Sequence, residues 1–275
     1  MRQERTVIKP GYSWALEWQE IKSNFELLYF FTWRNFKVRY KQTAIGALWA
    51  VVRPFTLMVV FTIVFNRGAG IQPDGDVPYA VFSYAGLLFW NYFSQSVSQV
   101  SSSLVAYQNI IKKIYFPRLL VPVSTAITGL IDFALSVLIF IGLVIHFDVS
   151  IQALGLILFI PLLIMSILTV LGVGLFMSAL NVRYRDVEQL MPFLVQVLLF
   201  VTPVIYPASI VPASWQWVLF LNPMTAVVEL SRYSLLGVGE LNVMGIGISI
   251  ISCLVAVIAG LLFFKSQERA LGDLI

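Results

Sequence analysis

The stretch WRNFKVRYKQTAIGALWAVVRP, residues Trp33–Pro54, is where the chain changes from a polar to an apolar sequence. On a helix, the rings of Trp33, Phe36 and Tyr40 fall in one narrow aromatic stripe. Four cations flank this stripe: Arg34, Lys37, Arg39 and Lys41. Such a helix is typical of the headgroup layer of a membrane, with rings pointing down and charges reaching up. From Ala44 onward the stretch is apolar except for Arg53, so it predicts an interface helix that leads into a first span.

The composition is that of a membrane protein. Of the 275 residues, 59% are hydrophobic and only 12% are charged, whereas a soluble domain carries about a quarter charged residues. No segment is polar enough for a separate soluble domain, so residues 1–275 are interpreted as one transmembrane domain. The single cysteine, Cys253, excludes a disulfide within one chain and predicts a small core residue.

Signatures of catalysis are missing from the sequence. There is no G-x-x-x-x-G-K-[ST] phosphate loop, no Cys/His cluster and no carboxylate pair. The only histidine, His146, is expected to be a solvated boundary residue. We therefore expect no catalytic residue, metal site or cofactor in this chain, and no nucleic-acid partner.

Apolar segments predict an all-α integral membrane protein with six spans, since a span needs about 20 apolar residues. Residues 1–43 are interpreted as a polar tail and an amphipathic interface helix, which begins near Ser13 and turns one face, including Trp14, Trp18 and Leu28, to the membrane. The predicted spans are residues 44–65, 79–105, 122–146, 152–180, 190–206 and 243–264, and residues 265–275 form a tail.

A further apolar segment, residues 213–236, is broken by Asn222–Pro223, and neither half could cross a membrane alone. Broken backbone at membrane depth is tolerated only where protein or a wet cavity covers it. This segment predicts a re-entrant helical hairpin that enters from the outer face before the last span.

The distribution of Lys and Arg predicts the orientation. Apart from Arg67 and Arg232, all of them lie in the N-terminal region through Arg53, in two loops at 106–121 and 181–189, or in the tail. By the positive-inside rule, both termini and these loops are cytoplasmic.

Charged and polar groups inside the spans are candidate functional sites because they are costly there. Arg53 and Asp132 either neutralise each other, or Arg53 reaches the cytoplasmic face, or it faces an anionic group at the mouth of a conduit. In the second span, Gln95, Gln99 and Ser102 share a helix face. They form either helix–helix hydrogen bonds or the wall of a wet passage.

Several motifs occur in a fixed order along the chain. They are R-x-x-x-x-R-Y-K-x-T-x-x-G-x-L-W at Arg34–Trp49, G-x-x-x-W at Gly86–Trp90, I-K-K-I-Y-F-P-R-x-x-x-P at Ile111–Pro122, N-V-R-Y-R-D-V at Asn181–Val187, and L-N-P-M-T with E-x-x-R at Leu221–Arg232. Together they resemble the permease subunit of ABC exporters of polysaccharides and polyol phosphates, in the ABC type-2 transporter superfamily.

This resemblance implies a homodimer in the bacterial inner membrane, paired with two copies of a cytoplasmic ATPase that binds ATP and Mg. It implies that a lipid-linked polysaccharide moves outward. The residues implied to couple to the ATPase are Ile111, Lys112, Lys113, Tyr115, Phe116, Pro117, Arg118, Arg183, Arg185 and Asp186. The re-entrant segment becomes an outer gate that includes Asn222, Pro223, Glu229 and Arg232.

A sliding glycan needs apolar surfaces and few tight hydrogen bonds. We therefore expect a conduit lined by Trp49, Phe55, Trp90, Phe93, Gln95, Gln99, Phe193, Phe200 and Tyr206; alternatively, the aromatic rings face lipid or form an interfacial belt. The headgroup of the substrate would be received by Arg34, Lys37, Arg39, Lys41 and Arg53. Rival hypotheses are an exporter of teichoic acid or of a small lipid or drug, and a membrane enzyme acting on polyprenyl-linked sugars with Arg53 and Asp132 in its site.

Overall fold

The computed structural model describes residues 24–41 and 46–274, and every regular element in that part of the chain is helical. The longer helices are α2 (Phe25–Tyr40), α3 (Trp49–Phe61), α4 (Tyr79–Ala106), α6 (Leu120–His146), α7 (Ala153–Arg183), α8 (Val187–Val201), α10 (Pro223–Leu236) and α11 (Val243–Leu274). The short elements are η1 (Gly46–Leu48), the π-helical η2 (Thr62–Gly68), α5 (Gln108–Ile111), η3 (Ala208–Ile210) and α9 (Ala213–Leu219). The predicted all-helical class is confirmed.

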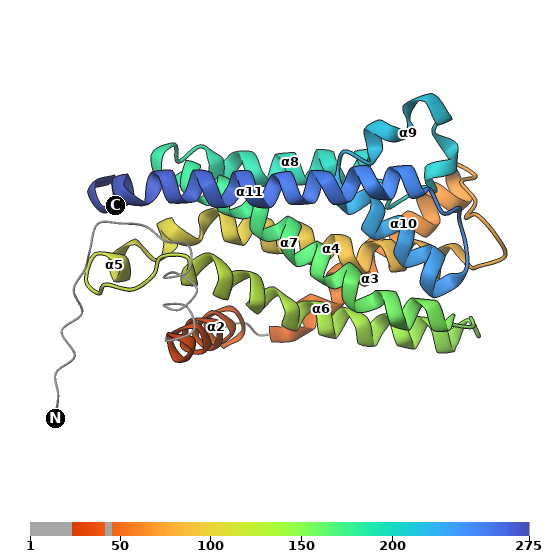
Figure 1. Ribbon diagram of the computed structural model, residues 1–275. Helices are drawn as coiled ribbons and strands as arrows, with labels where there is room; N and C mark the ends of the chain where they lie inside the picture. The colour runs from red at the N-terminus through yellow and green to blue at the C-terminus, as the bar shows by residue number, and fades with distance from the viewer. Residues whose placement is uncertain (1–23, 42–45, 275) are drawn as a thin grey trace.

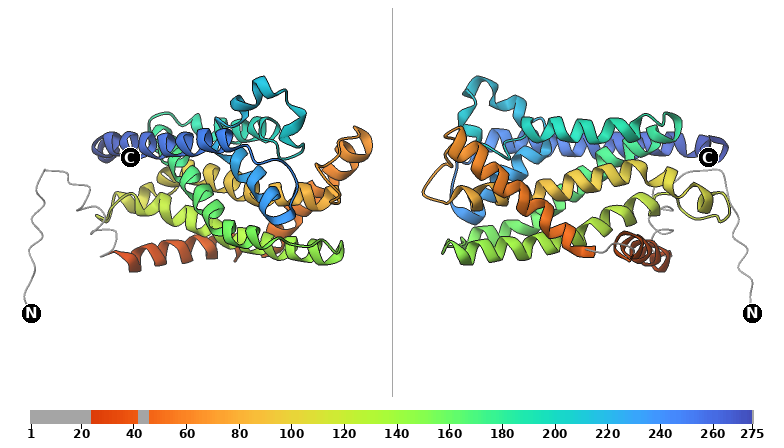
Figure 2. Two further views of the ribbon diagram at one scale, coloured as in Figure 1. Left: turned by 45° about the vertical axis from the view of Figure 1, so that its right-hand side comes forward. Right: turned by 180° about the vertical axis from the view of Figure 1, so that it is seen from behind.

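Most of the long helices run along the length of the molecule, whereas α2 crosses it. In the right-hand view of Figure 2, α2 is seen nearly end-on while α3, α4 and α6 extend across the picture. Such a crossing is the geometry predicted for an interface helix. The predicted start of that helix at Ser13, with Trp14 and Trp18, lies outside the described residues.

Four described helices are long and apolar enough to cross a membrane: α3 with η2, α6, α7 and α11 as far as Gln267. Two predicted spans do not meet that criterion. Helix α4 has 28 residues but a polar second half, and α8 has only 15 residues. The number of six spans therefore stays a prediction.

Three predicted boundaries differ from the structure. The predicted interface helix does not run directly into the first span, because α2 ends at Tyr40 and Gly46 has a φ of 54° before α3 begins. The fifth span ends at Val201 rather than at 206, since Pro203 holds the preceding residue in an extended conformation. Helix α11 continues to Leu274, so the helix of the last span runs on through most of the predicted tail.

Helix α4 lies at the centre of the bundle, where α3, α6, α7, α8 and α10 all contact it. Its serines are tolerated there because many of them donate to carbonyls one turn back in the same helix. Ser98 donates to the carbonyl of Ser94 (2.9 Å) and Ser101 to that of Ser98 (2.7 Å). The most polar of the long lengthwise helices is thus the one most enclosed by protein.

The broken segment forms two short helices, as predicted. Asn222 is the N-cap of α10: its side chain accepts a hydrogen bond from the backbone N–H of Met224 (3.1 Å) and donates one to Thr202 Oγ1 (2.7 Å). Helix α9 is largely exposed, whereas α10 is mostly buried against α4 and α7. The chain enters and leaves this hairpin at the same end of the bundle (Figure 1).

Close packing of α7 on α11 depends on two glycines. A Cβ atom at Gly172 would lie 2.7 Å from the backbone of Ala256 and Val257, and one at Gly260 would collide with the carbonyl of Gly172. Small residues that let backbones approach are a common basis of helix association in membranes.

Replacement of Gly260 by Val is therefore expected to separate α7 from α11 and to lower stability by about 1–3 kcal/mol, the usual cost of overpacking. The melting temperature of the purified protein in detergent measures this. Gly247→Val is the matched control on the same helix, because nothing lies within 4 Å of a Cβ atom there. Equal melting temperatures for the two variants would contradict the prediction.

Candidate functional site

One end of the bundle carries most of the described surface cations, and we call it the basic end. This end contains helices α2 and α5, the turn between α7 and α8, and the last part of α11 (Figure 1). The other end contains α9 and the start of α10. The exposed cations of the basic end include Lys112, Lys113, Arg183 and Arg185. The sequence and the structure thus agree that the positive charge is one-sided.

Helix α2 is fastened to the bundle by a cluster of four polar side chains. Arg39 forms an ion pair with Asp132 of α6 and donates a hydrogen bond to Gln99 of α4. The hydroxyl of Tyr40 donates to the other carboxylate oxygen of Asp132. The Asp132 side chain is only 11% exposed, so this carboxylate is neutralised within the protein.

Of the alternatives for Arg53 and Asp132, mutual neutralisation is wrong, because Asp132 pairs with Arg39. Helix α2 lies across the bundle and brings Arg39 to α6. Arg53 is exposed on α3. Arg39, which was expected to face a substrate headgroup, is therefore engaged inside the protein.

The aromatic stripe is present: the ring centroids of Trp33 and Phe36 are 5.4 Å apart, and those of Phe36 and Tyr40 are 5.0 Å apart. Lys37 lies above the Trp33 ring, with 5.3 Å between Nζ and the centroid. Lys41 is exposed at the end of α2.

Arg34 stacks on Tyr107, at 4.7 Å from its ring centroid. The Tyr107 hydroxyl donates to the Asn35 side chain, and burial raises the pKa of Tyr107 above its ordinary value. The Nη1 of Arg34 and the Nδ2 of Asn35 are buried and have no hydrogen-bond partner. Two donors are thus left without a partner in α2, at the basic end.

Exposed aromatic rings are confined to particular helices of the bundle. Helices α3 and α8 both pack on α4 and carry four of the predicted conduit residues in exposed positions: Trp49, Phe55, Phe193 and Phe200. The exposed large apolar side chains of α6, α7 and the described part of α11 are instead all aliphatic or methionine. Lipid tails surround all faces of the bundle alike, so contact with lipid alone does not explain why α3 and α8 differ from α6, α7 and α11. The exposed rings therefore distinguish the face of α3 and α8 from the faces of those helices.

The polar half of α4 has one partly uncovered face. It contains the half-buried residues Ser94, Gln95, Ser98, Gln99 and Ser102. The remaining predicted conduit residues lie deeper. Trp90 and Phe93 are 2% and 3% exposed and belong to the core, and the half-buried Tyr206 donates to the carbonyls of Phe200 and Val201.

The loop between α4 and α6 projects from the basic end. Lys112, Lys113 and Tyr115 are exposed at its tip, and Tyr115 is 81% exposed. Phe116 is buried and packs on Phe31 of α2, with 5.2 Å between centroids. Ile111, Pro117 and Arg118 are half-buried, and a second exposed turn carries Arg183, Arg185 and Asp186. An anchored base with an exposed tip suits a surface that another protein can contact.

Arg232, predicted as part of an outer gate, is buried near the opposite end of the bundle and is only 1% exposed. Its guanidinium donates to the carbonyls of Pro203 (2.6 Å), Val204 (2.5 Å) and Tyr206 (3.3 Å) in the segment after α8. It also donates to the carbonyl of Phe82 in α4 (3.2 Å). One side chain of α10 thus ties together three parts of the chain.

Two further contacts complete this arrangement, which we call the Arg232 clamp. Glu229 accepts a hydrogen bond from Arg232 (3.2 Å), and the guanidinium carbon lies 3.7 Å from the Phe82 ring centroid. A Cβ atom at Gly86 would lie 2.8 Å from Nη2 of Arg232, so the glycine leaves room for the clamp.

Several functional contacts were missed at the sequence level. Tyr40 was assigned only to the aromatic stripe, although it follows Arg39 directly and both reach Asp132. The stacking of Arg34 on the Tyr107 ring could not be found from the sequence, because the two residues are far apart in the chain. Among the described residues, no group of three or more His, Cys, Asp or Glu side chains could hold a metal ion.

The sequence was compared with protein families and with known proteins. Residues 26–236 match the family model described as ABC-2 type transporter. The chain is 27% identical to an O-antigen export system permease protein RfbA of Klebsiella pneumoniae over 91% of this chain and 95% of the relative. A protein of the same description from Myxococcus xanthus is 27% identical over 70% and 74%. The polysialic acid transport protein KpsM of Escherichia coli is 24% identical over 86% and 92%.

Proposed function

Because the chain belongs to the ABC-2 type transporter family, we propose that it is the membrane-spanning permease subunit of an ATP-driven exporter of O-antigen-like, lipid-linked polysaccharide. The family is one of transport proteins rather than enzymes, and it implies a partner ATPase. The two Klebsiella pneumoniae relatives described as O-antigen export permeases align over 95% of their length, and their identity to this chain is higher than that of the polysialic acid transport proteins. This favours O-antigen-like polymers over polysialic acid.

We propose that the basic end faces the cytoplasm of a bacterium and that the protein is a multi-pass protein of the inner membrane with both termini cytoplasmic. The one-sided cations support this orientation. Two copies of a cytoplasmic ATPase, which hold ATP and Mg, would seat on the loop around Lys112 and Tyr115 and on the turn around Arg185. This chain would need no cofactor of its own.

The face formed by α3, α8 and the half-buried side of α4 is proposed as the wall of the polysaccharide conduit, completed by a second copy of the chain in a homodimer. The single observation that carries this proposal is that α3 and α8 carry exposed aromatic rings, whereas the exposed large apolar side chains of α6, α7 and the described part of α11 are aliphatic or methionine. Aromatic faces contact the C–H surfaces of sugars, and the adjoining amides and hydroxyls of α4 exchange hydrogen bonds with sugar hydroxyls without holding them.

The substrate headgroup is proposed to arrive at α2. Since Arg39 is occupied by Asp132, the remaining candidates to bind a pyrophosphate are Arg34, Lys37, Lys41 and the exposed Arg53. The unpartnered donors of Arg34 and Asn35 favour the first of these. The rival hypothesis of a membrane enzyme loses its basis, because Arg53 and Asp132 do not meet.

Simultaneous replacement of Trp49, Phe55, Phe193 and Phe200 by Ala removes the proposed sugar-contacting rings and is expected to reduce surface polysaccharide at least about tenfold. The variant should still fold, because each ring is exposed and removal of an exposed side chain costs little stability. The measurement is surface polysaccharide in cells that depend on this permease. The matched control replaces four exposed aliphatic residues, Ile157, Ile160, Leu254 and Ile258, by Ala. Undiminished export by the aromatic variant, with the ATPase still co-purifying, would contradict the conduit.

A further inference from the structure

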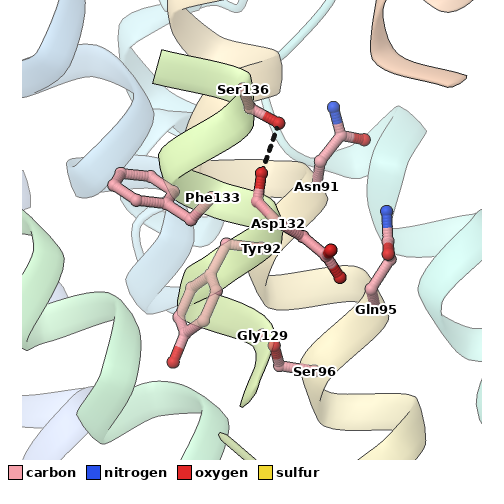
Figure 3. A pocket seen from close by; sticks show the side chains of 8 residues that line it. All are labelled: Asn91, Tyr92, Gln95, Ser96, Gly129, Asp132, Phe133 and Ser136. Atoms are coloured by element: carbon pink, nitrogen blue, oxygen red, sulfur yellow. Dashed lines mark hydrogen bonds between the residues drawn. The ribbon is translucent and has the colours of Figure 1, made fainter. Parts of the chain in front are cut away.

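A small polar pocket lies between α4 and α6, next to the cluster that fastens α2. Its volume is about 10 Å³, and its lining includes Asn91, Gln95 and Ser96 of α4 and Gly129, Asp132 and Ser136 of α6. In Figure 3 the carboxylate of Asp132 lies between Asn91 above and Ser96 below. A space of about 10–15 Å³ holds one water molecule.

Two buried groups in this pocket have no hydrogen-bond partner in the protein: Nδ2 of Asn91 and Oγ of Ser96. Asn91 is 8% exposed and Ser96 is 1% exposed, so bulk water does not reach them. An unsatisfied buried polar group costs about 1–3 kcal/mol. The neighbouring Ser136 hydroxyl is already satisfied, because it donates to the backbone carbonyl of Asp132 (3.0 Å; Figure 3).

We propose that this pocket binds one water molecule, which joins α4 to α6. The water accepts hydrogen bonds from Asn91 and Ser96 and donates to the carboxylate of Asp132. Each carboxylate oxygen offers two acceptor positions. Arg39 and Tyr40 take one on each oxygen, so acceptor capacity remains for the water.

A metal cation fits the pocket poorly. Asn91 presents an N–H donor, and Arg39 already places a positive charge on Asp132, the one carboxylate that lines the pocket. Water suits either orientation of the Asn91 amide, because it both donates and accepts. A pocket of the same size lined only by apolar groups would stay dry.

Gly129 keeps the pocket open. A Cβ atom at this position would collide with the Ser96 hydroxyl and force it to move. With the water in place, hydrogen bonds run from α4 through the water to Asp132 and on to Arg39 and Tyr40 of α2. This adds a water-mediated link between the interface helix and the central helix to the direct hydrogen bond from Arg39 to Gln99, whatever the exported molecule is.

The sign of a stability change distinguishes a bound water from an empty pocket. If the water is bound, Ser96→Ala and Asn91→Leu each remove a hydrogen bond, and each lowers the melting temperature of the full-length protein in detergent by about 2–4 °C. If the pocket is dry, the same substitutions remove unsatisfied groups and raise the melting temperature.

The double variant gives the second readout. Because both side chains bind the same water, the decrease in melting temperature of the double variant should be smaller than the sum of the decreases of the two single variants. Ser103→Ala is the matched control, since Ser103 is a buried α4 serine that donates within its own helix to Val100 (2.7 Å) and should change little. Three results would each overturn the proposal. They are single variants at least as stable as the parent, decreases in melting temperature that are strictly additive, and stabilisation of the parent that requires added NaCl or KCl.

Discussion

Replacement of Arg232 by Met is expected to abolish export and to leave little folded protein. The substitution removes the hydrogen bonds that the guanidinium donates to the carbonyls of Pro203, Val204 and Phe82, and it leaves the Glu229 carboxylate without its partner. Removal of one member of a buried ion pair costs about 3–5 kcal/mol, and the unpaired carbonyls add to this loss. The yield of monodisperse protein, its melting temperature and surface polysaccharide all report the effect.

Arg232→Lys should rescue only part of the loss. An ammonium group has three donors and no planar fork, so it cannot reach carbonyls on both sides of the clamp.

Gly86→Val tests the same clamp without a change of charge, because the valine side chain would press on Nη2 of Arg232.

Arg67→Gln is the control for loss of a positive charge, since Arg67 is exposed beyond α3. It should fold and export like the parent protein. An Arg232→Met variant that melts and exports normally would show that the clamp contributes nothing.

The second large effect is expected at the ion pair between Arg39 and Asp132. Either Arg39→Met or Asp132→Leu should lower stability by about 3–5 kcal/mol, because each leaves an uncompensated charge in a largely enclosed position. The double variant should be more stable than either single variant, since an apolar pair can replace a buried ion pair at little cost.

Melting temperatures of the parent, the two single variants and the double variant complete this cycle. Arg67→Met, at the position already used for a control, is the matched control for a lost cation. If the losses of the single variants simply add in the double variant, Arg39 and Asp132 do not act as a pair.

Local features of the fold could be predicted well from the sequence. The interruption at Asn222–Pro223 is an example, because an N-cap residue followed by Pro at the first helical position defines a helix start within a few residues. The aromatic stripe of α2 likewise follows from helical spacing alone.

Contacts that depend on the angle between helices could not be predicted. The partner of Asp132 is decided by the turn near Gly46, and periodicity gives no information about the direction of such a turn. Arg232 shows the same limit: charge counting assigned it to the outer side. Its burial depends on carbonyls 26–29 positions away, which are available because Pro203 ends α8.

The central position of α4 has a consequence for biogenesis. This helix is synthesised second among the lengthwise helices, yet α6, α7, α8 and α10, which cover it, emerge from the ribosome later. Until they arrive, its glutamines and asparagine face lipid or the insertion machinery, where unpaired amides are costly. We therefore expect membrane integration of this protein to be a concerted late event, so that chains interrupted before α10 are clients of membrane quality control.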